Sequence, residues 1–333
     1  MEDNASKIIS NALSVGKINL YNNIENIIKE VEKALFINKD LILEANKIDQ
    51  KNNNGYIIDF NILNNIFKNL EKETIIYGNV TISEKDEEKK IIYGKQIMDY
   101  GNVLVINDGN PYVIIEMALR NILAGNTIIF ANKGYMYGTN NLIINIIETV
   151  LEKFEISKYL IQLYITEEFD SILSNYANIN LVVCIGNRNL QNMILSKSKI
   201  KTITSGYENF DLYIEDSSHI DLLDKIIASG LNIQLYINSN TNLNYKEAIS
   251  VNDIDEAIAQ INYNGSKYST SIFTNLPDNA SKFMREVNSK IVAVNTSPTI
   301  ERIIDIKQSD LIIEKTFIYP LNFKFDGSRI DIN

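Results

Sequence analysis

The stretch that most constrains the fold of this chain spans residues 110–140 and reads as a helix, a tight turn, a buried strand and a loop. Apolar residues recur at helical spacing up to Gly125, and a glycine just past the last of them favours a left-handed helix end. Residues 127–131 form a short apolar run with β-branched side chains, which is typical of a parallel strand buried on both faces. A strand, a loop and a following helix leave a nucleotide-sized crevice at the carboxyl end of the strand. The same pattern also suits an ordinary βα unit.

Strand-like and helix-like segments alternate from residue 102 to residue 230, which predicts an α/β protein with a doubly wound parallel sheet. At 333 residues the chain is long enough for two domains. We expect a Rossmann-like domain over residues 1–230, a smaller α/β domain over 231–305, and a C-terminal segment over 306–333. Ser217 or Ser218 is expected to cap one helix, and Asp253 another.

Four helices are expected before the first strand, within residues 1–15, 23–36, 39–49 and 59–70. The charge run at 83–90 is expected to be a solvated loop between two β-like runs, with a hairpin at about 88–101. The chain closes with two more β-like runs, at 310–317 and 318–325, and the segment over 306–333 can return to this hairpin.

Composition excludes several classes of function. The formal charge is −10, so the chain has no general electrostatic attraction to nucleic acid or to an anionic membrane. No apolar run is long enough to span a bilayer, and residues 1–7 are polar and acidic, unlike a signal peptide. The simplest expectation is a cytoplasmic protein with no nucleic-acid and no membrane partner.

The chain contains one cysteine, Cys184, and one histidine, His219. An intrachain disulfide and a cysteine zinc site are therefore impossible within this sequence, and no acidic cluster has metal-ligand spacing. We expect no metal. Neither a GxGxxG motif nor a P-loop is present. His219 is expected to be a surface or capping residue.

Several collinear phrases resemble a known family. They are Pro111 with the helix up to Gly125-Asn126, the phrase ILEANKID at 42–49, and the phrase VNDIDEAIAQINYNGSKYSTSIFT at 251–274. Together they resemble the γ-glutamyl phosphate reductases (glutamate-5-semialdehyde dehydrogenases), a branch of the aldehyde dehydrogenase superfamily. The resemblance implies an aldehyde dehydrogenase-like fold, NADP or NAD as cofactor, and a β-hairpin arm that pairs between the subunits of a homo-oligomer.

The same resemblance implies a nucleophilic cysteine that attacks an aldehyde or acyl phosphate, with hydride transfer to or from the nicotinamide. Alignment places that cysteine near Ile237, and no cysteine occurs between residues 185 and 333. Cys184 either fills a strand end as a small apolar residue or is a displaced nucleophile. Tyr112 stands where the family has an oxyanion-binding asparagine, and its hydroxyl offers a donor of different reach. The segment after Ile237 is much shorter than in the family, which implies a reduced catalytic domain.

Five residues at expected strand ends are candidates for cofactor contact, although each also suits a plain βα turn: Lys133, Gly186, Asn187, Ser205 and Gly206. Lys133 falls where the family has one of two basic anchors. No catalytic residue is assigned.

Three functions fit these observations. The first is a degenerate, non-catalytic protein of the superfamily that is a partner or regulatory subunit, in a homo-oligomer or with a homologous active chain. The second is an active NAD(P)-dependent glutamate-5-semialdehyde dehydrogenase or acyl-phosphate reductase. The third is a module that binds a small ligand or a protein without a nucleotide. Turnover separates the second from the others, and nucleotide binding tests the third.

Overall fold

A computed structural model of the chain describes residues 4–15, 24–52, 56–72, 80–205, 210–228, 233–243, 245, 248–265, 269–297 and 306–321. The chain divides into two compact units, which are described separately. The first comprises Met1–Ile185, Met193–Ser205 and Asp305–Asn333, and the second comprises Gly186–Asn192 and Gly206–Ile304. Within the described ranges, no helix has the length and the hydropathy needed to cross a membrane.

The first unit is built on a five-stranded parallel sheet with the order β5-β4-β3-β6-β7. Its strands are β3 (Asn102–Asn107), β4 (Thr127–Asn132), β5 (Ile161–Ile165), β6 (Leu181–Ile185) and β7 (Thr202–Ser205). The first strand, β3, is central and almost wholly buried. Because β4 and β6 lie on opposite sides of β3, the winding direction reverses between β3 and β6.

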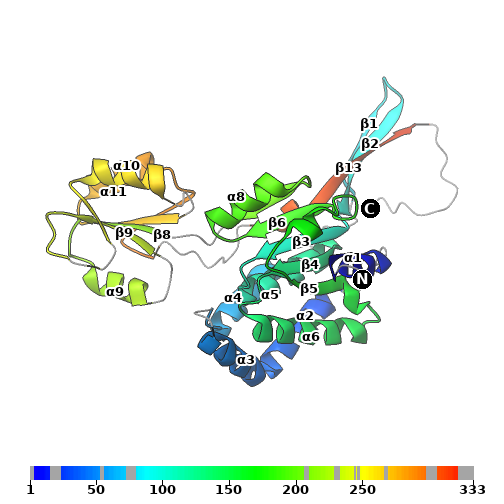
Figure 1. The fold of residues 1–333 in the computed structure, drawn as a ribbon. Coiled ribbons are helices and arrows are strands. Elements are labelled where there is room, and N and C mark those ends of the chain that lie inside the picture. Colours follow the sequence, from blue (N-terminus) through cyan, green and yellow to red (C-terminus); the bar gives the residue numbers. More distant parts are fainter. Residues whose placement is uncertain are drawn as a thin grey trace. The chain divides into compact units, whose positions relative to one another are not determined.

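Helices cover this sheet in more than one layer. They are α1 (Asn4–Ser14), α2 (Ile24–Ile37), α3 (Lys39–Asn52), α4 (Phe60–Glu71), α5 (Pro111–Ala124), α6 (Tyr137–Lys153) and the single turn α7 (Asp170–Leu173), with 3₁₀ turns η1 (Lys158–Leu160) and η2 (Gln308–Leu311). Helix α8 (Arg188–Lys197) is divided between the units, with its residues up to Asn192 in the second unit and those from Met193 in the first. Helices α5 and α6 contact the sheet, while α2 and α3 pack against α6, and α4 against α5 (Figure 1). Helix α5 is consequently buried along its whole length.

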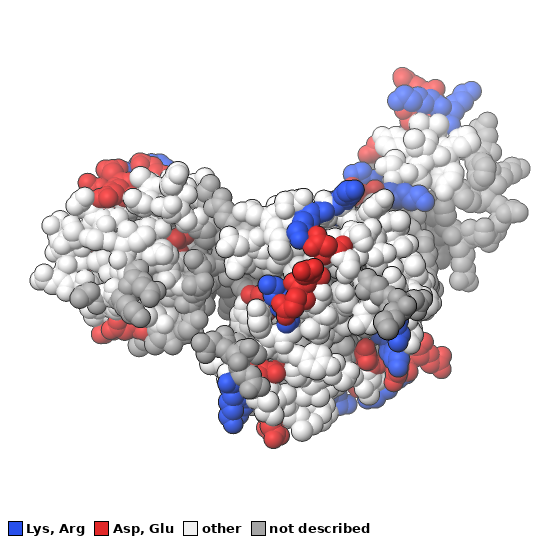
Figure 2. Space-filling model, in the orientation of Figure 1, with Lys and Arg blue, Asp and Glu red and all other residues white. Residues whose placement is uncertain are grey.

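The first unit also carries an antiparallel arm with the strand order β1-β2-β13, formed by β1 (Val80–Asp86), β2 (Ile91–Asp99) and β13 (Ile312–Pro320). Its tip bears side chains of both charges (Figure 2). The expected loop at 83–90 and hairpin at 88–101 were misplaced, because β1 continues to Asp86 and the turn follows it. The charged residues at 84, 85 and 87–90 are exposed, so their side chains stay solvated even where the backbone pairs as a strand. The two expected closing runs, at 310–317 and 318–325, are one continuous strand, β13, where they are described, preceded by the turn η2; residues 322–325 lie outside the described residues.

The second unit has its own parallel sheet with the order β10-β9-β8-β11-β12. Its elements are β8 (Phe210–Ile214), α9 (Ile220–Ala228), β9 (Ile233–Asn238), β10 (Ile249–Val251), α10 (Ile254–Asn264), β11 (Ser269–Phe273), α11 (Pro277–Glu286) and β12 (Ile291–Val294). Both sheets wind in the same way, with the first strand central and the reversal between the first and fourth strands. Asp253 caps α10 as expected, by accepting a hydrogen bond from Glu256 N at 2.9 Å.

The expected fold class, α/β with doubly wound parallel sheets, is confirmed, but the expected single sheet over residues 102–230 is wrong. Strand β8 pairs with β9 and β11, so it and α9 belong to the second unit. The boundary between the units lies at residues 205–206 and not at 230. The sequence pattern does not reveal it, because strands and helices alternate without a break across this point. Helix α9 also begins at Ile220, later than an N-cap at Ser217 or Ser218 requires.

Asn126 joins three parts of the first unit. Its side chain is fully buried; it accepts a hydrogen bond from Tyr100 N at 2.7 Å and donates to Asn121 Oδ1 at 3.0 Å and to Leu311 O at 2.9 Å. The preceding Gly125 ends α5 with a φ of 79°, as expected from the sequence. The Gly-Asn phrase therefore fixes the end of α5, the base of the arm and the returning C-terminal segment together.

We expect Asn126→Ala to lower the free energy of unfolding by about 2–4 kcal/mol, since three hydrogen bonds are lost and buried partners stay unsatisfied. Urea unfolding followed by circular dichroism measures the change. Asn145→Ala, at an exposed position of α6, is the matched control and should change stability by less than about 0.5 kcal/mol. Equal effects of the two substitutions would contradict this role of Asn126.

Candidate functional site

The loop after β3 is held by its own side chains. Asn107 Oδ1 accepts a hydrogen bond from Gly109 N at 2.6 Å, and Asn110 Oδ1 caps α5 by accepting from Tyr112 N at 2.9 Å. Asp108 accepts a hydrogen bond from the Tyr56 hydroxyl at 2.7 Å. Gly109 has a φ of 95°, a conformation that favours glycine. These contacts fix the backbone at the point where the winding of the sheet reverses.

The hydroxyl of Tyr112 is committed to a structural contact. It donates to Ile57 O at 3.0 Å and accepts a hydrogen bond from Asp59 N at 2.5 Å, directly before α4. Burial raises the pKa of Tyr112 to about 12. A hydroxyl held in this way has its donor already engaged, so it is not poised to stabilise an oxyanion.

The N-terminus of α6 is occupied by a carboxylate of the protein itself. Asp49 Oδ2 accepts hydrogen bonds from Thr139 N at 2.7 Å and from Thr139 Oγ1 at 2.6 Å, and Asp49 Oδ1 accepts from Gly138 N at 3.3 Å. Helix N-termini attract anions because their first N–H groups lack partners within the helix. Asp49 belongs to the ILEANKID phrase, so that phrase supplies an internal anion at a place where a phosphate would otherwise be favoured.

Lys133 lies directly after β4, in the loop before α6. Its side chain is half-buried and has no hydrogen-bond or ion-pair partner among the residues that the structure describes. The turn is set by Asn132 Oδ1, which accepts a hydrogen bond from Gly134 N at 2.9 Å. Of the candidate cofactor contacts, Lys133 is therefore the one that offers an unpaired positive charge.

The other candidates have local structural roles where they are described. Asn187 Oδ1 accepts a hydrogen bond from Leu190 N at 2.9 Å at the start of α8, and Gly186 O accepts from Gln191 Nε2 at 2.8 Å. A Cβ atom at Gly186 would lie 2.6 Å from Leu190 Cδ2, so a larger residue here would require the Leu190 side chain to shift. Ser205 ends β7, paired with Ile185.

These five candidates are not gathered within one unit. Lys133 and Ser205 belong to the first unit, and Gly186 and Asn187 to the second. Gly206 lies outside the described residues. The structure therefore leaves their role in cofactor binding as a prediction.

Cys184 is a buried residue of β6. Its neighbours in the sheet are Ile106 on β3 and Thr204 on β7. Burial, with a smaller contribution from the charge of Asp108, raises the pKa of the Cys184 thiol to about 12. Since the thiolate is the nucleophilic form, a thiol with this pKa has almost no reactive population at neutral pH.

Ile237, the position aligned with the family's cysteine, is also a core residue. It lies on β9, paired with Ile214 of β8, and its side chain belongs to a hydrophobic cluster that includes Leu223 and Phe273. The strand ends at Asn238, whose Oδ1 accepts a hydrogen bond from Asn240 N at 2.9 Å. Neither of these residues supplies a nucleophile.

At the reversal point of the second sheet, the loops after β8 and β11 are bonded to each other. Glu215 accepts hydrogen bonds from Thr274 Oγ1 and from Asn279 Nδ2, the latter at 2.5 Å. Asp216 accepts from Asn275 N at 2.8 Å and from Ser218 N at 2.9 Å.

Burial opposes ionisation of Asp216, but hydrogen bonds from Ser218 and Asn275 outweigh it and lower its pKa. This polar cluster is not among the residues expected from the sequence to form a site. The sequence pattern that could have predicted it is a pair of apolar strands, each followed directly by polar residues. That pattern is common to α/β sheets in general, so it does not distinguish this cluster.

We expect Tyr112→Phe to destabilise the protein by about 1–3 kcal/mol, because Asp59 N and Ile57 O lose a buried partner. The change in the urea midpoint gives the size of the effect. Tyr159→Phe is the control, since the Tyr159 hydroxyl has no hydrogen-bond partner in the described part of the chain. If Tyr112→Phe leaves the free energy of unfolding unchanged, the two hydrogen bonds of the hydroxyl do not stabilise the fold.

Cys184 should resist modification by a disulfide reagent such as 5,5′-dithiobis(2-nitrobenzoate) while the protein is folded. Raising the pH from about 7 to about 9 should accelerate the reaction strongly in denaturant, where the thiol has its ordinary pKa, but hardly in the folded state. Absorbance of the released thiolate measures both rates. Rapid modification of the native protein would contradict a buried, protonated thiol.

No protein-family model matches the chain. The γ-glutamyl phosphate reductase of Dictyoglomus thermophilum is 22% identical to it, over 84% of this chain and 80% of that protein. That of Brachyspira hyodysenteriae is 24% identical, over 82% of this chain and 79% of that protein.

Solved structures show the same likeness in fold. The γ-glutamyl phosphate reductase of Thermotoga maritima matches with a TM-score of 0.64 and 16% identity, over 97% of this chain and 99% of that one. The NADP-dependent glyceraldehyde-3-phosphate dehydrogenase of Bacillus halodurans, complexed with NADP, matches with a TM-score of 0.69 and 14% identity, over 95% and 91%. The chain thus has the fold of the aldehyde dehydrogenase superfamily and resembles, at low identity, the γ-glutamyl phosphate reductases.

Proposed function

We propose that this chain is a non-catalytic, aldehyde dehydrogenase-like protein of the cytoplasm that is a subunit of an oligomer, either with copies of itself or with a homologous active chain. The observation that carries the proposal is the state of its one thiol. Cys184 is buried within a parallel sheet with its pKa raised to about 12, and the aligned position of the family's nucleophile is the core residue Ile237. Covalent catalysis by a thiolate has no residue to perform it.

The surrounding groups support the same conclusion. Tyr112, which replaces the oxyanion-binding asparagine, is bonded to the backbone before α4. The loops at the reversal point of the second sheet bond to each other through Glu215 and Asp216. Donors and acceptors that are already paired within the chain contribute little to binding a transition state.

NADP or NAD is the cofactor that a chain with this fold would hold. Lys133 is the residue that would contact a phosphate or ribose oxygen, since its ammonium group is unpaired among the described residues. Asp49 opposes such a contact at the neighbouring helix, because its carboxylate occupies the N-terminus of α6. We therefore expect weaker nucleotide binding than in an active dehydrogenase.

The oligomer would form through the arm. Strand β13 pairs with β2 along one edge, and no strand of the described chain pairs with its other edge. Such an edge presents unpaired backbone groups that a second strand can bind. Ile318 is 64% exposed on this strand and adds apolar surface to it.

The purified chain should not catalyse NADP-dependent or NAD-dependent oxidation of glutamate-5-semialdehyde with phosphate, measured by reduced-nicotinamide absorbance. A γ-glutamyl phosphate reductase assayed in parallel shows that the assay works. Turnover that Cys184→Ser or Lys133→Ala abolishes would instead establish an active dehydrogenase. Thermal shift with both nucleotides in the same samples separates a nucleotide-binding subunit from a module that binds none.

Ile318→Lys should weaken self-association, because a lysine on an edge strand costs desolvation when another strand pairs with it. Size-exclusion chromatography with light scattering gives the mass at several concentrations. Ile57→Lys, at a position 74% exposed and outside the arm, is the matched control. An unchanged mass for Ile318→Lys would place any self-association elsewhere. If the wild-type chain is monomeric, a homo-oligomer is excluded and an oligomer with a homologous active chain is the remaining form of the proposal.

A further inference from the structure

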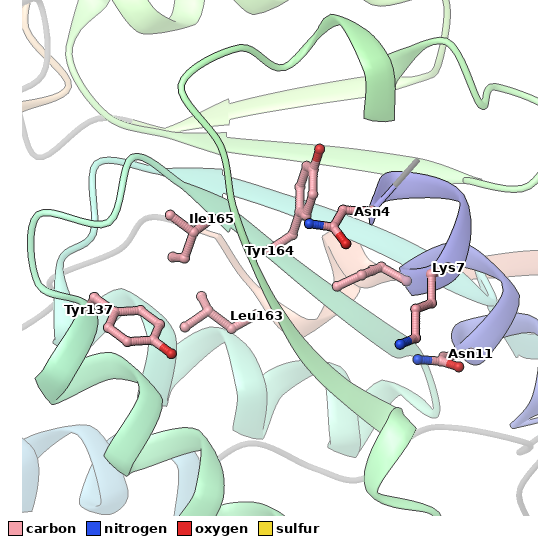
Figure 3. Close-up of a pocket in the computed structure, with 8 residues that line it drawn as sticks. Asn4, Lys7, Asn11, Tyr137, Leu163, Tyr164 and Ile165 are labelled. Atoms are coloured by element: carbon pink, nitrogen blue, oxygen red, sulfur yellow. The ribbon is translucent and has the colours of Figure 1, made fainter. Parts of the chain in front are cut away.

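The first unit contains a hollow that does not include any of the residues discussed above for catalysis or cofactor contact. Its volume is about 620 Å³, within the usual size range of small-molecule sites. It lies between α1, the first residue of α6 and the last residues of β5 (Figure 3). Strand β5 is at the edge of the sheet, with β4 between it and β3. The hollow is therefore away from the reversal point between β3 and β6.

Helix α1 forms one wall of the hollow and is anchored to β5. Its residues Ala5, Ile9 and Ala12 are buried. Gln162 on β5 donates a hydrogen bond to Ile8 O at 3.0 Å and accepts one from Asn11 Nδ2 at 3.2 Å. The wall is thus fixed in place by both apolar packing and hydrogen bonds, so a ligand would not have to order it.

The lining combines one cation with an apolar floor. Lys7 and Asn11 are four residues apart on α1, so they lie on the same face and point into one end of the hollow (Figure 3). The ring of Tyr137, 52% exposed, and the side chains of Leu163 and Ile165, the latter 39% exposed, line the other end.

Among the residues that the structure describes, which begin at Asn4, no acidic side chain lines the hollow, although acidic residues outnumber basic ones in the full sequence by 42 to 32. The ammonium group of Lys7 and the hydroxyl of Tyr137 have no hydrogen-bond partners among the residues that the structure describes. Both groups are therefore available to a ligand.

We propose that this hollow binds a small organic anion with an aromatic ring, in which a carboxylate or phosphate group pairs with Lys7 and the ring packs on Tyr137 and Ile165. The anion would gain a charge-assisted hydrogen bond at one end, and the ring would remove exposed apolar surface from water at the other. This site goes beyond the proposed function, because it needs neither the nicotinamide cofactor nor the oligomer.

Isothermal titration calorimetry of the full chain tests the proposal with phenyl phosphate and benzoate as probes. Inorganic phosphate represents the anion alone, and benzyl alcohol represents the ring alone. At least one of the two aromatic anions should bind at one site per chain, about tenfold or more tightly than either fragment. The tighter of the two identifies the preferred anionic group.

Lys7→Gln should weaken binding of the aromatic anion about tenfold and leave benzyl alcohol unaffected, whereas Tyr137→Ala should weaken both. Lys29→Gln, at an exposed position of α2, should change neither and controls for net charge. Circular dichroism confirms that each variant is folded. Absence of binding at about 10 mM, or binding that Lys7→Gln and Lys29→Gln weaken equally, would overturn the proposal.

Discussion

The burial of α5 along its whole length is the constraint on which the first unit depends. A helix of this kind needs a neighbour on every side, and β4, α4, α6 and η2 supply them. Its polar residues must also be paired. Arg120 donates to Glu116 at 2.9 Å, and Asn121 donates to Met117 O at 2.9 Å. Breaking a buried ion pair by removing one partner costs far more than the pair contributes, so this helix tolerates few substitutions.

The need to satisfy buried groups around α5 also explains the structural contacts of the polar residues at both ends of this helix. Tyr112 holds the backbone before α4, and Asn110 caps α5 itself. Asn126 connects the end of α5 to the arm and to the C-terminal segment. Each group has a partner within the chain, and a group that is paired in the folded state must break that contact before it can act on a substrate.

The two sheets have the same strand order, but they differ in which polar and charged side chains at their carboxyl edges are paired within the chain. In the second unit, loops at the reversal point bond to each other through Glu215, Asp216 and Asn275. In the first, Asp49 occupies the N-terminus of α6, while Lys133 stays unpaired among the described residues. Among the described residues, the loop after β4 therefore offers a cation that has no partner within the chain. The hollow beside Lys7 has the same property at the edge of the sheet.

The sequence by itself determined the class of fold, the helices around α5, the left-handed end at Gly125 and the cap at Asp253. Burial on both faces, amphipathic spacing and helix capping are local properties that nearby residues express. It also determined that Cys184 is the one thiol of this chain.

Only the tertiary structure decided that β8 belongs to the second sheet, that the arm begins at β1, and that Asp49 and Tyr112 have partners far away in the sequence. The physical reason is that strand pairing and buried hydrogen bonds join residues tens of positions apart. Nothing in the local pattern around Phe210–Ile214 distinguishes a strand that continues one sheet from a strand that begins another.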